Sequence, residues 1–253
     1  MEALIGNVCE GGLVEALNTR VYGNGNQTLV LSHGYGSDQS VWHYLLPCLA
    51  FYFKVVVFDL AFSPNVNPKF YDPNKYSFSN GFDPYAHDLI CILDQIKVSN
   101  SVYIGHSISM YLNASKYNGG FNKAELNSIF HTIHTNFSAW VRAFSPVAIG
   151  VNNSHAIAEF ETSLGRMKPE IALSVAKTVF LSDLRWVLPR VHVPSTIIQS
   201  KRDVVVPEFI AYYLKKKLGG HARVRILKAQ GHFPQLTAYP LLLHILKKVL
   251  GLD

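Results

Sequence analysis

Three short apolar runs, far apart in the chain, each end just before a chemically reactive side chain: Ser107, Asp203 and His232. Runs of this length, rich in β-branched residues and bounded by turn signals, are typical of buried strands. Reactive groups just beyond the carboxyl ends of parallel strands lie where open α/β sheets place their sites. The pattern therefore predicts an α/β fold, with a doubly wound and mostly parallel sheet, that gathers these three side chains at one edge.

The turn around Ser107 fits a nucleophile elbow, in which a strained strand-to-helix turn needs small residues two positions either side of the serine. Gly105 and Ser109 occupy those positions, and Ser109 departs from the usual glycine. Each feature also has an ordinary explanation when it is considered alone. The turn around Ser107 could be a common Gly/Ser turn, Asp203 could be a turn residue, and His232 could serve in packing or lie at the surface. The chain order serine, aspartate, histidine is that of α/β-hydrolases, and it favours a catalytic triad.

A second strand, residues 28–33, runs into the glycine-rich segment 33–36. In the α/β-hydrolase fold such a loop supplies one backbone N–H of the oxyanion hole, and the residue after the nucleophile supplies the other. We therefore expect the N–H groups of Tyr35 and Ile108 to be the donors. The alternative for the loop is a plain turn after a strand.

The length and composition of the chain predict a single globular domain that covers residues 1–253. The chain has 49% hydrophobic and 16% charged residues, which fits a packed interior. Its 23 Lys and Arg residues exceed its 17 Asp and Glu residues, but the basic runs at 215–217 and 247–248 fall on predicted helices. A solvated helix face explains them better than a nucleic-acid site, since no aromatic residues alternate with them.

The three cysteines, Cys9, Cys48 and Cys91, show no CxxC or other metal-binding spacing. We therefore expect reduced cysteines in an intracellular protein, with no metal. The amino terminus lacks the basic region and sustained apolar core of a secretory signal. No apolar run reaches about 18 residues, so no membrane span is expected.

Two further patterns concern single elements. The segment Gly23 to Asn26 is a hairpin signal before the strand that begins at Thr28. Asp83 followed by Pro84 predicts the start of a helix that continues to Val98.

From 119 to 188 the pattern is helical, with candidate starts at Asn122, Asn136, Asn153 and Lys168. Helices inserted between the nucleophile strand and the acid strand predict a lid over the site. Its inward apolar residues would be Phe121, Trp140, Phe144, Val147, Val179 and Phe180. Packing of these residues against one another within the lid is the alternative, which helical spacing predicts equally well.

With these residues placed, the chain resembles the plant strigolactone receptor-hydrolases and their karrikin-receptor-like relatives. The similarity runs from about residue 13 to 250 and is carried by residues 34–42, 71–76, 105–109, 139–140, 167–176, 182–185 and 231–236. It implies an α/β-hydrolase core under a lid of four helices.

The resemblance also implies a receptor in the cytoplasm and nucleus, without cofactor, that binds a butenolide ligand and slowly cleaves it. The cleaved ring can stay attached to His232, after which the lid rearranges and recruits an F-box protein of a ubiquitin ligase and a repressor. Carried onto this chain, it gives these roles: Ser107, Asp203 and His232 as the triad, Tyr35 and Ile108 as oxyanion donors, and Phe121, Trp140, Phe144 and Phe180 as ligand-pocket residues.

The chain departs from the family after Ser107. Family members have about 25 more residues there, whereas only residues 108–118 remain here, too few for a parallel connection of about a dozen residues and a further strand. We therefore expect one helix and one strand to be missing. The sequence therefore leaves three alternative hypotheses for the function. They are a slow butenolide-hydrolysing receptor, a non-catalytic or degenerate family member with an impaired fold, and a general carboxylesterase.

Overall fold

The computed structural model describes residues 9, 11–107, 111–114 and 117–252. The chain divides into two compact units. The first comprises Met1–Ile108 with Arg166–Thr178, and the second comprises Ser109–Gly165 with Val179–Asp253. Each unit is therefore built from two separate stretches of the chain.

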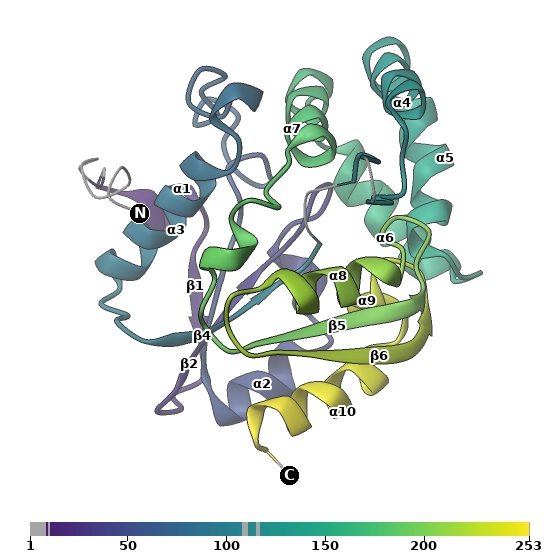
Figure 1. Ribbon diagram of the computed structural model, residues 1–253. Helices are drawn as coiled ribbons and strands as arrows, with labels where there is room; N and C mark the ends of the chain where they lie inside the picture. The colour runs from purple at the N-terminus through teal and green to yellow at the C-terminus, as the bar shows by residue number, and fades with distance from the viewer. Residues whose placement is uncertain (1–8, 10, 108–110, 115–116, 253) are drawn as a thin grey trace. The chain divides into compact units, whose positions relative to one another are not determined.

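The first unit contains a four-stranded sheet in the order β1-β3-β2-β4. Figure 1 labels β1, β2 and β4 of this sheet. Its strands are β1 (Arg20–Tyr22), β2 (Thr28–Ser32), β3 (Lys54–Phe58) and β4 (Ser101–Gly105). β2 pairs in parallel with β3 and with β4. Four of the five residues in both β2 and β3 are buried, as expected for parallel strands that are covered on both faces.

The predicted hairpin between β1 and β2 is wrong. β1 pairs antiparallel with β3, with Arg20 opposite Val57, and β3 also pairs with β2. β3 therefore lies between the two strands that the hairpin would have joined. Its continuous apolar side chains bury more surface in a central position than the short β1 could, so a long-range pairing overrides the local turn signal.

Short helices flank this sheet along the chain. They are α1 (Leu13–Ala16), the 3₁₀ turn Gln39–Trp42, α2 (Leu46–Tyr52), the 3₁₀ turn Phe78–Asn80 and α3 (Asp83–Gln95). Pro47 and Pro84 lie in the first turns of α2 and α3, where a residue without an N–H is tolerated. α3 ends at Gln95, three residues before the predicted end at Val98.

The second unit contains two parallel strands, β5 (Ser195–Arg202) and β6 (Ala222–Gln230). Helix α8 (Phe209–Lys217) contacts both strands and α10 (Tyr239–Leu250) contacts β6. Figure 1 shows the two helices on opposite sides of the strand pair. The 3₁₀ turn Leu188–Arg190 precedes β5, and α9 (Pro234–Thr237) follows β6.

Four helices occupy residues 123–181, as the sequence predicted. They are α4 (Lys123–Thr135), α5 (Phe137–Ile149), α6 (Ser154–Gly165) and α7 (Pro169–Leu181). The side chains of Asn122, Asn136 and Asn153 accept N–H hydrogen bonds of 2.9, 3.0 and 3.1 Å in the first turns of α4, α5 and α6. These caps confirm the predicted starts, because a polar side chain satisfies an otherwise unpaired N–H there. Residues of α7 up to Thr178 belong to the first unit.

The expectation of reduced cysteines is wrong for two of the three. Cys9 and Cys91 form a disulfide across 82 residues, and only Cys48 is a free cysteine in the described part of the chain. The pairing depends on the fold bringing Cys9 to helix α3, which sequence spacing does not reveal. Among the described residues, no helix is long and apolar enough to cross a membrane.

Strands β4 and β5, on either side of the shortened segment in the sequence, each pair with a single neighbour among the described residues. Within the described residues, β4 pairs with β2 alone and β5 pairs with β6 alone. The described part of residues 111–121 forms two isolated bridges, Leu112 with Phe121 and Ala114 with Tyr117, and no strand. Tyr103 of β4 is 54% exposed. Among the described residues β4 is therefore an edge strand, which agrees with the expected loss of one helix and one strand.

Candidate active site

Asp203 and His232 form a direct pair in the second unit. Asp203 follows β5 and His232 follows β6, so the parallel pairing of the two strands brings both side chains to the same end. Nδ1 of His232 lies 2.8 Å from Oδ2 of Asp203, and both side chains are buried. Because a carboxylate only accepts, Nδ1 carries the proton and Nε2 remains the basic nitrogen.

Asp203 is held as a carboxylate. Burial alone would raise its pKa, but the hydrogen bond and charge attraction from His232, with N–H groups donated by Val206 and Val205, hold the pKa below its usual range. Those N–H groups lie 3.0 and 2.8 Å from Oδ1. An ionised carboxylate fixes the orientation of an imidazole and stabilises its protonated form.

The turn that carries His232 is joined to the end of helix α5. The N–H of His232 donates to the carbonyl of Ala148 at 2.8 Å. Gly231 and Gly150 meet at this junction: a Cβ on Gly231 would lie 1.8 Å from the carbonyl oxygen of Ile149, and a Cβ on Gly150 would lie 2.6 Å from Cα of Gly231. Glycine is required at both positions because the two backbones touch.

Ser107 occupies a strained turn in the first unit. Its φ is 69°, in the left-handed region, which costs an L-residue about 1–2 kcal/mol. The preceding N–H, that of His106, donates to the carbonyl of Ser32 at 3.0 Å and so extends the pairing of β4 with β2. A strained serine directly after a parallel strand is the geometry of a nucleophile elbow.

The loop after β2 lies directly against this elbow. A Cβ on Gly34 would lie 3.0 Å from Cβ of Ser107, so only glycine allows the close approach. The carbonyl of Gly34 accepts three hydrogen bonds: from the N–H of Ser37 at 3.3 Å, from its hydroxyl at 3.0 Å, and from Nδ1 of His33 at 2.9 Å. The backbone at Tyr35 is thereby fixed beside the serine, where an oxyanion donor is needed.

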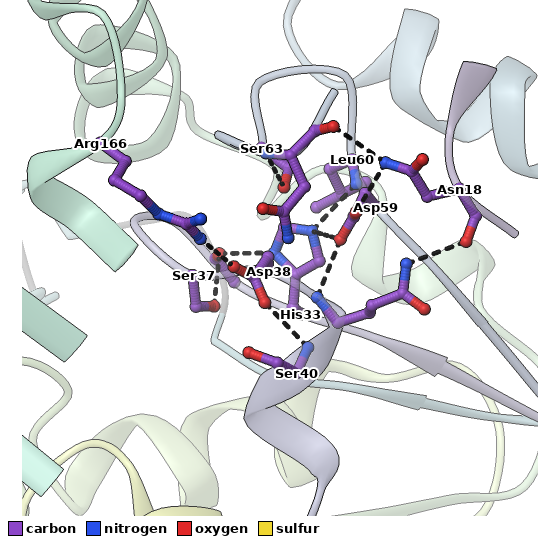
Figure 2. Close-up of polar contacts among 12 residues, drawn as sticks. Asn18, His33, Ser37, Asp38, Ser40, Asp59, Leu60, Ser63 and Arg166 are labelled. Carbon is purple, nitrogen blue, oxygen red and sulfur yellow. Dashed lines mark hydrogen bonds and ion pairs between the residues drawn. The ribbon is translucent and has the colours of Figure 1, made fainter. Parts of the chain in front are cut away.

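His33 anchors the loop as a neutral imidazole (Figure 2). Nδ1 donates to Gly34, while Nε2 accepts the N–H of Leu60 at 2.9 Å. Burial lowers the pKa of His33, and this effect exceeds the opposing attraction of Asp59 and Asp38 and the bond to Gly34. Both ring nitrogens are used in structural bonds, so His33 supports the site and does not exchange protons in it.

Two bonds tie the same loop to the segment that opens helix α7. Arg166 donates to Oδ2 of Asp38 at 3.0 Å, as Figure 2 shows. The hydroxyl of Tyr35 donates to the carbonyl of Ala172 at 2.9 Å. The loop therefore has its backbone beside Ser107 and its side chains bonded to residues 166–172. The sequence reasoning missed Arg166, since nothing local relates it to Asp38.

The predicted site residues are thus distributed over both units. Asp203 and His232 lie together in the second unit. In the first unit Gly34, the residue before Tyr35, approaches Ser107. The pairing of Ser107 with His232 stays a prediction. Ile108, the other predicted oxyanion donor, lies outside the described residues.

The predicted pocket residues fall into two aromatic clusters of the second unit. Phe121 and Phe180, with ring centroids 5.7 Å apart, pack with Tyr111 and Phe130. Trp140 and Phe144 stack at 5.0 Å, and the contacts continue through Phe160 to Phe233, whose ring centroid lies 5.6 Å from that of His232. The sequence analysis missed Phe160 and Phe233, although Phe233 adjoins the histidine.

Val147 and Val179 were also predicted to point inward. Val179 is buried, whereas Val147 is 51% exposed. The buried residues near Val147 on α5 are Ser145, Ala148 and Ile149, so Val147 lies on the other face of the helix. The prediction that Val147 points inward is therefore wrong. Its apolar side chain lies at roughly helical spacing from the buried residues, and spacing alone placed it on the buried face of the helix.

Curated relatives match this chain almost end to end, although no protein-family profile matches it. The strigolactone esterase D14 of Arabidopsis thaliana is 40% identical, with 94% of this chain and 97% of that protein covered. The karrikin insensitive 2 receptor CA of Petunia hybrida is 38% identical, with 93% and 96% covered. The chain belongs to the strigolactone esterase and karrikin receptor family. The strigolactone esterase RMS3 of Pisum sativum, 37% identical with 94% and 98% covered, is another member.

Solved structures place this family member among the α/β-hydrolases. A hydrolase from Oleispira antarctica matches with a TM-score of 0.91 and 25% identity, and 97% of this chain and 99% of that chain are covered. An esterase from Exiguobacterium antarcticum matches with a TM-score of 0.80 and 15% identity, and 91% and 94% are covered. The predicted fold class is confirmed.

The alignment also bears on the shortened segment. The match to the Arabidopsis thaliana relative spans 263 positions, whereas 94% of the 253 residues here is about 238, about 25 fewer. This family member therefore lacks about 25 positions that its relative has, in agreement with the helix and strand missing after Ser107.

Proposed function

We propose that this member of the strigolactone esterase and karrikin receptor family binds a butenolide ligand and slowly hydrolyses its ester or enol-ether bond. The observation that carries the proposal is the buried 2.8 Å bond between His232 and Asp203, which leaves Nε2 of His232 as a base. The strained Ser107 and the loop of Tyr35 support it, since they supply a nucleophile and an anion-binding backbone side by side.

In the proposed reaction, Oγ of Ser107 attacks the ligand carbonyl while Nε2 of His232 accepts its proton. The negative charge that develops on the carbonyl oxygen is stabilised by the N–H groups of Tyr35 and Ile108. His232 then returns the proton to the leaving group, and Asp203 balances the charge of the imidazolium. Water releases the acyl group from Ser107 in the second half of the cycle.

We assign helices α4–α7 the role of the lid and Phe121, Trp140, Phe144 and Phe180 the role of its ligand-facing residues. The contacts from Trp140 through Phe160 and Phe233 to His232 favour this role, because they connect helix α5 to the base. By family resemblance, the ligand-bound form recruits an F-box protein of a ubiquitin ligase and a repressor in the cytoplasm and nucleus.

Intact-protein mass spectrometry after incubation with a butenolide ester analogue tests the proposal. We expect product release and an added mass on Ser107 or His232. Ser107→Ala should abolish both, whereas Ser79→Ala, which changes an exposed serine of the turn Phe78–Asn80, should not. Unmodified protein with no product would refute turnover. Equal turnover of simple short-chain acyl esters would favour a general carboxylesterase.

A second function is binding without turnover. The observation that favours it is that β4, the strand before Ser107, pairs only with β2 among the described residues. Thermal unfolding with the same analogue separates the two functions: a ligand at 100 times its Kd adds about 2.7 kcal/mol, a rise in Tm of about 5–10 °C for a chain of this size. A rise in Tm that is equal in the wild type and in Ser107→Ala, without product from either, would establish binding alone.

A further inference from the structure

The disulfide of the first unit lies beside a third potential ligand. Cys91 is on helix α3, and His87 precedes it by four residues, so the two share one face of the helix. Sγ of Cys91 lies 3.7 Å from Nε2 and 3.8 Å from Nδ1 of His87. One ligand-forming atom from each of Cys9, His87 and Cys91 lies within 4.8 Å of the other two.

This set of atoms fits the demands of a tetrahedral zinc ion. Zinc binds cysteine sulfur at about 2.3 Å and histidine nitrogen at 2.0–2.1 Å, so a sulfur and a nitrogen on one tetrahedral ion lie about 3.6 Å apart. The distances between Cys91 and His87 are close to that value before any ion is added. A helix that presents two ligands at the right separation needs only one further ligand to close a three-residue site.

We propose that reduction of the Cys9–Cys91 disulfide creates a zinc site whose ligands are the two cysteine sulfurs and one ring nitrogen of His87. Two small-molecule thiols reduce the disulfide, giving two cysteine thiols and one small-molecule disulfide. Binding of Zn²⁺ then displaces the two thiol protons, because thiolates are the ligands. A water molecule completes the tetrahedron.

The burial of the three side chains supports entry of an ion. Cys91 is fully buried, while Cys9 and His87 are half-buried. Two of the three ligands are therefore partly accessible to solvent, which allows a hydrated ion to exchange its waters for protein ligands. The disulfide and the zinc site exclude each other, since the disulfide occupies both sulfurs.

The consequence concerns the attachment of Cys9 to α3. The disulfide joins Cys9 to this helix under oxidising conditions, and zinc joins the same residues under reducing conditions. Only the reduced, metal-free chain lacks this attachment. Cys9 is thus held to α3 in both redox states wherever zinc is present.

Cobalt titration of the full chain tests the proposal, because Co²⁺ bound to thiolate gives a charge-transfer band that zinc abolishes on displacement. The chain is reduced with a phosphine, which takes up an oxygen from water as the disulfide gains two electrons, and the phosphine is then removed without air. We expect one equivalent of Co²⁺ to give the band, and Zn²⁺ to remove it. The unreduced chain should give no band.

Variants assign the ligands. Cys9→Ser should lose the band, and His87→Gln should lose or shift it, whereas Cys48→Ser should retain it. Cys9 is half-buried and the circular dichroism of its variant should match that of the wild type, so loss of the band reports on ligation. Absence of the band in the reduced wild type, its persistence in Cys9→Ser, or cobalt absorption without thiolate character would overturn the proposal.

Discussion

His33 shows how one side chain determines the geometry of a site that it does not enter. Its two nitrogens bond to the backbone at Gly34 and Leu60, which fixes the loop beside Ser107. This arrangement requires the neutral ring, because a protonated Nε2 could not accept the N–H of Leu60. The support of the loop is therefore sensitive to pH.

We expect the free energy of unfolding to fall as the pH drops below about 6.5, the usual pKa of histidine. Burial lowers the pKa of His33 in the folded chain, so the unfolded chain binds the proton first and is favoured in acid. In His33→Asn this loss between pH 7 and pH 5 should be smaller, although the variant is less stable at pH 7. Urea unfolding at several pH values measures the slope.

The matched control is His131→Gln, which removes an exposed histidine of helix α4. Its slope should follow the wild type, because this variant leaves His33 and its two backbone bonds unchanged. An unchanged slope in His33→Asn would refute the role of His33.

Asp203→Asn should lower the rate of ester cleavage by about 10⁴-fold with little effect on ligand binding, because the amide favours the wrong tautomer of His232. The N–H bonds from Val205 and Val206 to Oδ1 can persist in the variant, so its fold should survive. Turnover of a butenolide ester and the ligand-induced shift in Tm measure the two effects. Asp183→Asn, in an ion pair with Arg185 of the same unit, is the control and should retain activity.

At the scale of elements, helix caps are local signals that the tertiary structure preserved. Asn122 closes a capping box with Glu125, in which each side chain bonds the backbone of the other. The bonds span only three residues, so the sequence alone predicted where α4 begins.

Asn122→Ala should lower the free energy of unfolding by about 1 kcal/mol, because the N–H of Glu125 loses its partner. Asn122→Asp keeps an acceptor at the same place and should cost only a small fraction of that amount. Urea unfolding of the three chains measures both differences. If the alanine and aspartate variants lose equal stability, the cap is not the cause.

The sequence failed where an element depended on a distant partner. The strands before Ser107, Asp203 and His232 were predictable because each carries its own apolar run. The partner of β1 was not, since Gly23 to Asn26 signals a turn whichever strand comes next. The same limit applies to the bond between Arg166 and Asp38 and to the disulfide of Cys9, because each joins segments that no local pattern relates.

At the scale of the whole molecule, the chain lacks about 25 of the positions aligned with its Arabidopsis thaliana relative. The sequence predicted this loss from the eleven residues between the elbow and Gly119, which are too few for a crossover and a strand. In the part of the chain that the structure describes, β4 and β5 each pair with a single neighbour. Backbone groups left unpaired at the edge of a sheet cost about 1–3 kcal/mol each when buried.

Restoring the segment should therefore stabilise the chain. The test is a chimera that carries the corresponding residues of the Arabidopsis thaliana relative after position 108. We expect its free energy of unfolding to rise by about 1–3 kcal/mol, the cost of one unpaired buried group. Its ester turnover should also rise, because β4 would again have strands on both sides. Urea unfolding and product release measure the two gains. A Gly-Ser insert of equal length is the control, and equal behaviour of the two inserts would contradict the prediction.

The junction between Gly150 and Gly231 constrains how such a protein can vary. Each glycine makes room for the backbone beside the other, so neither position can accept even a methyl group while its neighbour stays in place. An alanine at either site would displace the turn that carries His232. The two glycines therefore constrain each other, and a redesign of helix α5 should leave both in place.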